Sequence, residues 1–199
     1  MYRKTETTQY PCMSGEDYCF NILDKLGAGV YGTVWKAIDT KTGKFCAIKI
    51  LNEKYYNEQD IWNLAEVECL VKLRHPNIIG LQRVIWHNTL CHLVFELMDC
   101  DLSKLLIRRG RERPFSEDEV RSICFQILQG LARLHSEGYC HRDLKPQNIL
   151  ASGKVIKISD FGEATRITSA PQESYVVTRP YRALEILLGT THYDSAIHM

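Results

Sequence analysis

The strongest constraint on this chain is the polar octapeptide His141-Arg142-Asp143-Leu144-Lys145-Pro146-Gln147-Asn148, followed shortly by Asp160-Phe161-Gly162. Asp143 can orient a hydroxyl group for attack, and Asn148 and Asp160 can supply oxygen ligands to Mg²⁺. Phosphoryl transfer requires such a carboxylate together with such a metal site. A single aspartate often does no more than cap a turn. Two motifs in this order and at this short spacing favour catalysis.

The composition is that of an ordinary globular domain. The chain has 199 residues, 45% of them hydrophobic and 25% charged, with a formal net charge of +1. This length allows one domain with a substantial core, and the balanced charge indicates no nucleic-acid or membrane partner. No apolar run approaches transmembrane length, and the first residues lack an apolar signal segment. We therefore expect an intracellular protein of the cytoplasm, the nucleus or both.

The eight cysteines are scattered, without any C-x-x-C pair. Several lie in apolar runs, where a free cysteine behaves as a small hydrophobic residue. We expect reduced thiols rather than a disulfide framework or a thiolate metal site. The residues concerned are Cys12, Cys19, Cys46, Cys69, Cys91, Cys100, Cys124 and Cys140.

The first part of the chain is predicted to be rich in strands. Residues 1–19 form a polar leader, and residues 20–98 are mainly short strands with one helix interposed. The helix is indicated by apolar residues at three- and four-residue spacing, namely Leu64, Val67, Leu70 and Val71. The predicted strands, separated by glycine turns, are Phe20–Leu23, Thr33–Ile38, Phe45–Ile50 and Leu93–Phe95.

The second part, residues 99–199, is predicted to be mainly helical. Ser116 and Glu119 match a capping box, and Gly138 is a plausible helix end. Two short strands, Ile149–Leu150 and Val155–Ile158, are expected to bring Asp160 back towards Asp143. Between the capping box and Gly138, a stripe of apolar residues with helical period consists of Val120, Ile123, Ile127, Leu128, Leu131 and Leu134.

A glycine-rich segment precedes the second predicted strand. Gly27, Gly29 and Gly32 fit the pattern G-x-G-x-x-G-x-V, in which backbone amides can approach phosphate oxygens closely. The same spacing occurs in dinucleotide-binding Rossmann folds, and glycine clusters are often simple turns. In a Rossmann unit the last glycine opens a helix, whereas Gly32 opens the strand-like run Thr33-Val34-Trp35. The later motifs also exclude a Rossmann oxidoreductase.

Lys49, on the strand that follows the glycine segment, is predicted to contact the α- and β-phosphates of a nucleotide and to pair with Glu66. Isolated lysines and glutamates are mostly solvated surface charges. Glu66 lies on the helix that ends just before His75-Pro76-Asn77, and this position resembles that of the ion-pair glutamate in protein kinases, which favours the functional interpretation. Glu68 is the alternative partner, on another face of the same helix.

Together these motifs resemble eukaryotic protein kinases. Residues 178–189 are similar to the region around the family's A-P-E motif, and their Tyr181-Arg182 pair indicates the CMGC group, which includes cyclin-dependent and MAP kinases. Lys54-Tyr55-Tyr56 and the segment 175–179 are most similar to the MAK/ICK branch or to its neighbours among the MAP and cyclin-dependent kinases. The resemblance covers about residues 20–199. It implies an α+β, bilobal fold with a β-rich N-lobe (20–98), a helical C-lobe (99–199) and ATP in the cleft.

The resemblance also assigns roles to residues that the motifs alone do not identify. Lys145 is typical of serine/threonine kinases and lies on the phosphate side of Asp143, Thr178 supports Asp143, and Arg182 favours proline after the phosphorylated residue. Phe95 is the gatekeeper. The adenine pocket and the hinge are assigned to Leu26, Val34, Ala47, Leu150 and Glu96 to Met98.

The chain departs from the family pattern in its activation segment. A-P-E is Ala183-Leu184-Glu185, Pro180 replaces an aromatic residue, and Glu163 follows Asp160-Phe161-Gly162 in place of an apolar residue. The branch's T-x-Y motif is replaced by Glu173, Ser174 and Tyr175. We hypothesise that Glu173 lies near Arg142 and partly mimics a phosphothreonine, because a carboxylate carries less charge than a phosphate group.

The end of the sequence also differs from the family. His198 stands where kinases have an aspartate that anchors the catalytic loop, and Met199 is the last residue. The expected C-lobe is therefore incomplete, and the long helix after Ser116 would expose apolar surface that the family buries.

These observations predict an ATP- and Mg²⁺-dependent serine/threonine protein kinase that phosphorylates serine or threonine before proline. Its partners would be ATP, such protein substrates, and an upstream kinase or an activating subunit. The alternative is a chain that binds nucleotide with weak or no catalysis and acts as a scaffold or decoy.

Overall fold

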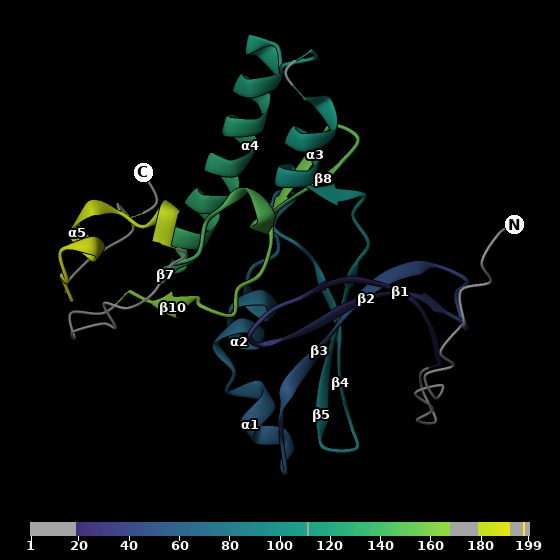
Figure 1. The fold of residues 1–199 in the computed structure, drawn as a ribbon. Coiled ribbons are helices and arrows are strands. Elements are labelled where there is room, and N and C mark those ends of the chain that lie inside the picture. The colour runs from purple at the N-terminus through teal and green to yellow at the C-terminus, as the bar shows by residue number, and fades with distance from the viewer. Residues whose placement is uncertain (1–18, 111, 168–178, 192–196, 198–199) are drawn as a thin grey trace, which may run out of the picture. The chain divides into compact units, whose positions relative to one another are not determined.

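The structure is a computed structural model that describes residues 19–110, 112–167, 179–191 and 197. The chain divides into two compact units (Figure 1). The first comprises Met1–Ile61 and Leu81–Leu97, and the second comprises Trp62–Gly80 and Met98–Met199. This division separates the chain close to the predicted lobe boundary at residue 98, but it groups residues 62–80 with the second unit. The lobe boundaries themselves stay a prediction.

The first unit contains a five-stranded antiparallel sheet and one short helix. The order of its strands is β1-β2-β3-β5-β4. The predicted strands are confirmed and extend further than their apolar runs. Helix α1 and strand β4 were not predicted, because α1 is too short to show a period and a register shift between Leu81 and Arg83 breaks the alternation of β4. The elements are β1 (Phe20–Ala28), β2 (Gly32–Asp39), β3 (Phe45–Lys54), α1 (Glu58–Trp62), β4 (Leu81–His87) and β5 (Leu90–Glu96).

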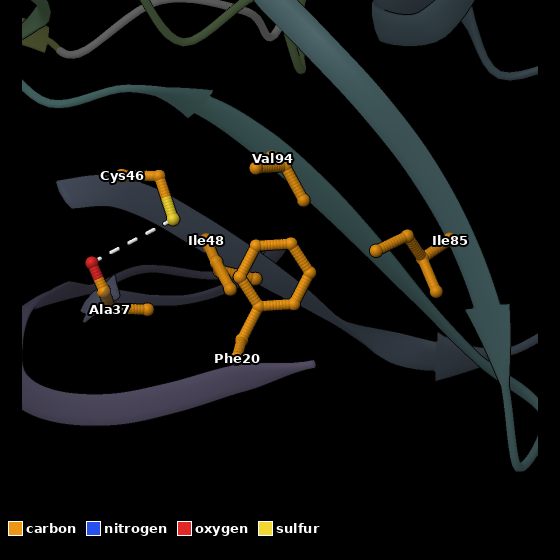
Figure 2. Packing of buried hydrophobic residues seen from close by; sticks show 6 residues of the cluster. All are labelled: Phe20, Ala37, Cys46, Ile48, Ile85 and Val94. Carbon is orange, nitrogen blue, oxygen red and sulfur yellow. Dashed lines mark hydrogen bonds between the residues drawn. The ribbon is translucent and has the colours of Figure 1, made fainter. Parts of the chain in front are cut away.

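The two faces of this sheet have different side chains. One face carries the core cluster drawn in Figure 2, in which every member is at most 3% exposed. Val34 pairs with Lys49, and Ala47 pairs with Phe95 across the neighbouring strands. Because side chains alternate along a strand, these four residues lie on the face opposite the core. The core cluster consists of Phe20, Ala37, Cys46, Ile48, Ile85 and Val94.

The second unit is built from helices and short strands. Two small sheets have the orders β10-β7 and β6-β8-β9. The predicted strands after the octapeptide are confirmed as β8 and β9, joined by a tight turn at Gly153. The elements are α2 (Ala65–Lys72), β6 (Cys100–Asp101), α3 (Leu102–Arg109), α4 (Glu117–Ser136), β7 (Tyr139–Cys140), η1 (Pro146–Asn148), β8 (Ile149–Ser152), β9 (Val155–Ile158), β10 (Thr165–Arg166), η2 (Arg179–Tyr181) and α5 (Leu184–Leu187).

The long helix α4 begins at the predicted capping box. The Ser116 hydroxyl accepts from the Glu119 N–H, and the Glu119 carboxylate accepts from the Ser116 N–H. Leu131 and Leu134 are buried as expected, whereas Val120 is 46% and Leu128 is 55% exposed. The helix therefore presents apolar surface, as the sequence predicted. On helix α2 the expected burial of Val71 is wrong, because Val71 is 51% exposed while Val67 and Leu70 are buried.

Helix α4 is attached to strand β9 through polar side chains. Gln126 accepts from the Ile156 N–H through Oε1 at 2.9 Å and donates to the Lys154 carbonyl through Nε2 at 2.9 Å. Asn77 donates to the same Gln126 oxygen at 3.0 Å and to the Ile156 carbonyl at 2.9 Å. These bonds saturate main-chain groups of β9 and fix the position of the strand that leads to Asp160.

Of the seven cysteines in the described part of the chain, six follow the prediction, and Cys12 lies outside it. Cys46, Cys69, Cys91, Cys100, Cys124 and Cys140 are free. Burial raises the pKa of the Cys69 thiol to about 12. The expectation is wrong for Cys19, which is disulfide-bonded. Among the described residues, no helix is both long and apolar enough to cross a membrane.

Replacing Gly130 by alanine tests the contact between α4 and β9. A Cβ at this position would lie 2.8 Å from the Asn77 carbonyl oxygen and 2.9 Å from Cδ1 of Ile158. Alanine normally stabilises a helix by about 1 kcal/mol relative to glycine. Here we expect Gly130→Ala to lower the free energy of unfolding by about 1–3 kcal/mol, because the helix must move away from the strand.

Denaturant unfolding measures this effect. The matched control is Gln129→Ala, at the neighbouring exposed position, which should change the free energy of unfolding by no more than about 0.5 kcal/mol. A Gly130→Ala variant as stable as the Gln129→Ala variant would contradict the close packing.

The buried histidines predict that stability falls in mild acid. Burial lowers the pKa of His92 and of His141. Each therefore binds fewer protons in the folded than in the unfolded chain, whose histidine pKa is about 6.5. The free energy of unfolding should fall as the pH drops below about 6.5, by at most about 1.4 kcal/mol per pH unit for each histidine.

Substituting His92 tests this assignment, since among the described residues its buried Nδ1 has no hydrogen-bond partner. We expect His92→Leu to reduce the slope of stability against pH between about pH 6.5 and 5. Urea unfolding at a series of pH values measures the slope. Parallel curves for the two proteins would show that His92 does not contribute.

Candidate active site

The octapeptide forms a loop between β7 and β8 that is fixed from within by His141. His141 is fully buried, and its Nδ1 accepts a hydrogen bond from the Asp143 N–H at 3.2 Å. Its Nε2 therefore carries the proton and donates to the Ser159 carbonyl at 3.0 Å. Burial lowers the pKa of the imidazole, which favours this neutral form. The Phe161 ring packs against it edge-on, with centroids 4.9 Å apart.

The Asp143 carboxylate is held by two side chains of its own loop. Lys145 Nζ lies 2.5 Å from Oδ2, and Asn148 Nδ2 donates to the same oxygen at 3.0 Å. Asp143 is only 9% exposed. Charge-assisted hydrogen bonds of this kind are strong and directional. The loop thus presents one oriented carboxylate with a cation beside it.

Asn148 joins this loop to the segment that contains Asp160. Its Nδ2 also donates to the Asp143 carbonyl at 2.8 Å. Its own carbonyl accepts from the Ser159 N–H at 2.8 Å and from the Ser159 hydroxyl at 3.0 Å. Asp160 follows directly, so the structure confirms that β8 and β9 return the chain to the octapeptide. The sequence analysis did not identify Ser159 as a residue of the site, although its position directly before Asp160 could have indicated this role.

Two residues of this region have left-handed backbone conformations. Asp160 has φ 60° and Arg142 has φ 63°. Such conformations cost about 1–3 kcal/mol in non-glycine residues and persist where the surrounding contacts enforce them. Arg142 Nε donates to the Glu163 carbonyl at 2.6 Å, which connects the octapeptide to the residues after Gly162. Asn88 and Thr89, in the turn between β4 and β5, are the other non-glycine residues with positive φ in the described part of the chain.

The donor set fits Mg²⁺ in part. Both hydrogen bonds made by Nδ2 of Asn148 go to Asp143, so the amide oxygen of Asn148 points away from Asp143. Asp160 adds a carboxylate to this oxygen as a second possible ligand. Mg²⁺ is commonly held by one or two protein oxygens together with phosphate and water oxygens. No group of three or more His, Cys, Asp or Glu side chains in the described part of the chain could hold a metal ion alone. Asn148 and Asp160 therefore fit a metal that arrives with a phosphate.

In the first unit, the glycine segment forms the turn between β1 and β2. Gly29 N–H donates to the Gly32 carbonyl at 2.9 Å. A Cβ on Gly32 would lie 2.5 Å from the Ile50 carbonyl oxygen, so this glycine is needed for the close approach of β2 to β3. Gly27 and Gly29 have open space around them. These two positions leave room for a phosphate group near the main chain.

Asn52 holds the tip of this turn, a role that the sequence analysis did not predict. Its Nδ2 donates to the Val30 carbonyl at 2.8 Å, and its N–H donates to the Tyr31 carbonyl at 3.0 Å. Val30 itself is 84% exposed. The turn is therefore fixed through its main chain while its side chains face solvent.

The predicted nucleotide residues are divided between the units. On the non-core face of the first sheet, Lys49 is only 7% exposed and lies between Val34 and Leu93 on the adjacent strands. Leu26 is 40% exposed on β1, and Glu96 ends β5. In the second unit, Glu66 is a buried residue of α2, Met98 precedes β6, and Leu150 lies on β8.

Five residues named in the sequence analysis lie outside the part of the chain that the structure describes, namely Thr178, Glu173, Ser174, Tyr175 and His198. Arg182 is described and half-buried, directly after η2. Pro180 lies within η2, and Glu163 follows Gly162 in a turn.

The fold is that of a protein kinase. The protein kinase domain pattern matches residues 20–199, and the chain belongs to this family. It is 46% identical over 181 residues, 90% of its length, to cyclin-dependent kinase F-4 of Oryza sativa subsp. japonica. It is 43% identical to the serine/threonine-protein kinase ICK of Rattus norvegicus and 42% identical to MAK of Mus musculus, each over 180 residues and 89% of the chain.

These relatives confirm the predicted resemblance to CMGC kinases and to the MAK/ICK branch. The α+β kinase fold class is confirmed as well. The chain spans 39% of the length of cyclin-dependent kinase F-4, 28% of ICK and 29% of MAK.

Substituting Asn148 by aspartate tests the hydrogen bonds around Asp143. The new side chain has nearly the same shape, but it loses both donor contacts and places a second carboxylate beside Oδ2. We expect the free energy of unfolding without metal to fall by about 2–4 kcal/mol at neutral pH. The loss should shrink below about pH 5, because protonation of one carboxyl removes the repulsion.

Chemical denaturation in a chelating buffer measures the change. The matched control is Asn88→Asp, at an exposed turn position with φ 49°, which aspartate also tolerates. A loss for Asn148→Asp no greater than that for Asn88→Asp would show that the amide does not hold the loop.

Proposed function

We propose that this chain is a serine/threonine protein kinase domain that transfers the γ-phosphate of ATP to a protein hydroxyl. The observation that carries the proposal is the oriented Asp143 carboxylate, with Lys145 at 2.5 Å and Asn148 at 3.0 Å from one oxygen. Asp143 would accept the hydrogen bond of the attacking hydroxyl, and Lys145 would offset negative charge on the transferred group. The names of the relatives, which are serine/threonine and cyclin-dependent kinases, support the reaction class.

The remaining predicted residues would bind the nucleotide. Asn148 and Asp160 would hold Mg²⁺, which supplies charge neutralisation at the phosphates when bound. Lys49, paired with Glu66, would hold the α- and β-phosphates, and the main chain at Gly27 and Gly29 would cover them. The burial of Lys49 supports a structural or binding role over that of a solvated surface charge. Adenine would lie against Leu26, Val34, Ala47 and Leu150, between the gatekeeper Phe95 and the hinge from Glu96 to Met98.

Substrate choice and activation are further parts of the proposal. Arg182 would favour proline after the phosphorylated serine or threonine, and Thr178 would support Asp143. Cyclin-dependent relatives suggest an activating subunit, and an upstream kinase acting on Ser174 or Tyr175 is the alternative. Glu173 would partly take the place of an activating phosphate near Arg142.

The Asp143→Asn variant tests catalysis separately from binding. We expect phosphate transfer from ATP to a serine-proline peptide to fall by about 10²–10⁴-fold, because the carboxylate that orients the hydroxyl is lost. Mg²⁺-ATP at about 100 times its dissociation constant should still stabilise the fold by about 2.7 kcal/mol. Radiometric transfer and thermal unfolding give the two readouts.

A peptide with alanine in place of proline is the control for specificity and should be a poorer substrate. Equal transfer by the unmodified and Asp143→Asn proteins would contradict the role of Asp143. Nucleotide-dependent stabilisation without any transfer by the unmodified protein would favour the alternative function, a nucleotide-binding scaffold.

A further inference from the structure

An ion-pair network joins helix α2 to the strand that follows the Asp160 motif. Glu68 Oε1 on α2 accepts from Arg166 Nη2 on β10 at 2.6 Å and from Lys72 Nζ at 2.8 Å. Glu68 and Arg166 are 98 positions apart in the sequence. The contact therefore connects two segments that no local structure brings together.

Tyr139 on β7 completes this network. The Arg166 guanidinium lies over the Tyr139 ring, 5.2 Å from its centroid, and Lys72 Nζ is 3.5 Å from the Tyr139 hydroxyl. Arg166 and Tyr139 are also paired in register between β10 and β7. The hydrogen bonds from Lys72 and then Arg166 lower the pKa of Glu68 to about 2. Glu68 is thus bound by two cations from two different elements.

The geometry of α2 relates this network to Glu66. Residues two apart on an α-helix are separated by roughly 200° around its axis. Glu68 therefore projects from the side of α2 opposite to Glu66, and its side chain is 37% exposed, whereas Glu66 is buried. Fixing Glu68 to β10 fixes the rotation of the helix about its axis. The direction in which Glu66 projects depends on that rotation.

The alternative is that these residues form an ordinary surface ion pair. The Arg166 side chain is 55% exposed, and exposed pairs contribute little to global stability. A role in local structure is favoured here, because Glu68 and Arg166 lie on two different elements, α2 and β10. The pairs of Arg121 with Glu117 and Asp118, by contrast, all lie within the first turns of α4.

We infer that Glu68 and Arg166 are a positioning pair, which holds α2 in the rotation that directs Glu66 and couples it to the strand after Asp160-Phe161-Gly162. This inference rests on the proposed function in assigning Glu66 to the nucleotide-binding lysine. The coupling of α2 to β10 does not depend on that assignment. Movement of β10 would turn α2, and release of α2 would free β10.

A double-substitution cycle tests the coupling by hydrogen exchange of the α2 amides. A variant with the two charges exchanged is unsuitable, because Lys72 would repel an arginine at position 68. Glu68 and Arg166 are therefore each replaced by glutamine. We expect Glu68→Gln and Arg166→Gln each to raise exchange in residues 65–72 by roughly two- to fivefold. The double variant should exchange no faster than the faster single variant. Arg166→Lys, which keeps the charge, should restore at least part of the protection.

The matched control is Arg121→Gln, which removes an exposed arginine paired only within α4 among the contacts above and should leave exchange in α2 unchanged. Fold-changes that multiply in the double variant would overturn the inference, because independent effects combine in that way.

Phosphate transfer tests the consequence for Glu66. Arg166→Gln should lower the rate of transfer in the unmodified protein and have no further effect in a Glu66→Gln background, because it acts through that residue. An equal decrease in both backgrounds would overturn the positioning role. If the unmodified protein transfers no phosphate, the proposed function fails, and the exchange cycle alone decides whether the pair couples α2 to β10.

Discussion

The hydrogen bonds between the octapeptide loop and Ser159 are the interactions on which the candidate site depends. Buried His141 donates to the Ser159 carbonyl, and the Asn148 carbonyl accepts both the N–H and the hydroxyl of Ser159. The β8–β9 hairpin returns the chain to the octapeptide, and these bonds join the residue before Asp160 to that loop. An unpaired buried polar group is costly, so the loss of any one of these bonds would destabilise the loop. The left-handed residues Arg142 and Asp160 lie directly after His141 and Ser159.

The first unit buries a lysine, Lys49, on its β-sheet. Its core cluster occupies one face, and Lys49 is placed on the other with Val34, Ala47 and Phe95. The alternation of side chains along β2, β3 and β5 produces this division. Gly32 contributes through packing, since any side chain there would collide with the Ile50 carbonyl. Gly32, which is assigned to nucleotide binding, is therefore also required for the packing of β2 against β3.

The sequence predicted those parts whose signals are local. The capping box at Ser116 and Glu119, the hairpin around Gly29, and the strands on either side of Gly153 all follow from residues near one another, and the structure contains them. Strand β4 was missed because a register shift hides its alternation. The burial of Val71 was overestimated because a helical period does not say how wide the buried stripe is. The disulfide at Cys19 had no signal in the cysteine spacing.

By itself the sequence determined the family and the residue types from which the chemistry of the site is proposed. The residue types at 141–148 and 160–162, in that order, predict a hydroxyl-orienting carboxylate and oxygen ligands, and they indicate the protein kinase family, to which the chain belongs. Only the tertiary structure decided which groups hold these residues. Ser159, Asn52 and the pair of Glu68 with Arg166 act across distances along the chain that no periodic pattern records. Motifs encode chemistry locally, whereas orientation arises from contacts that exist only once the chain has folded.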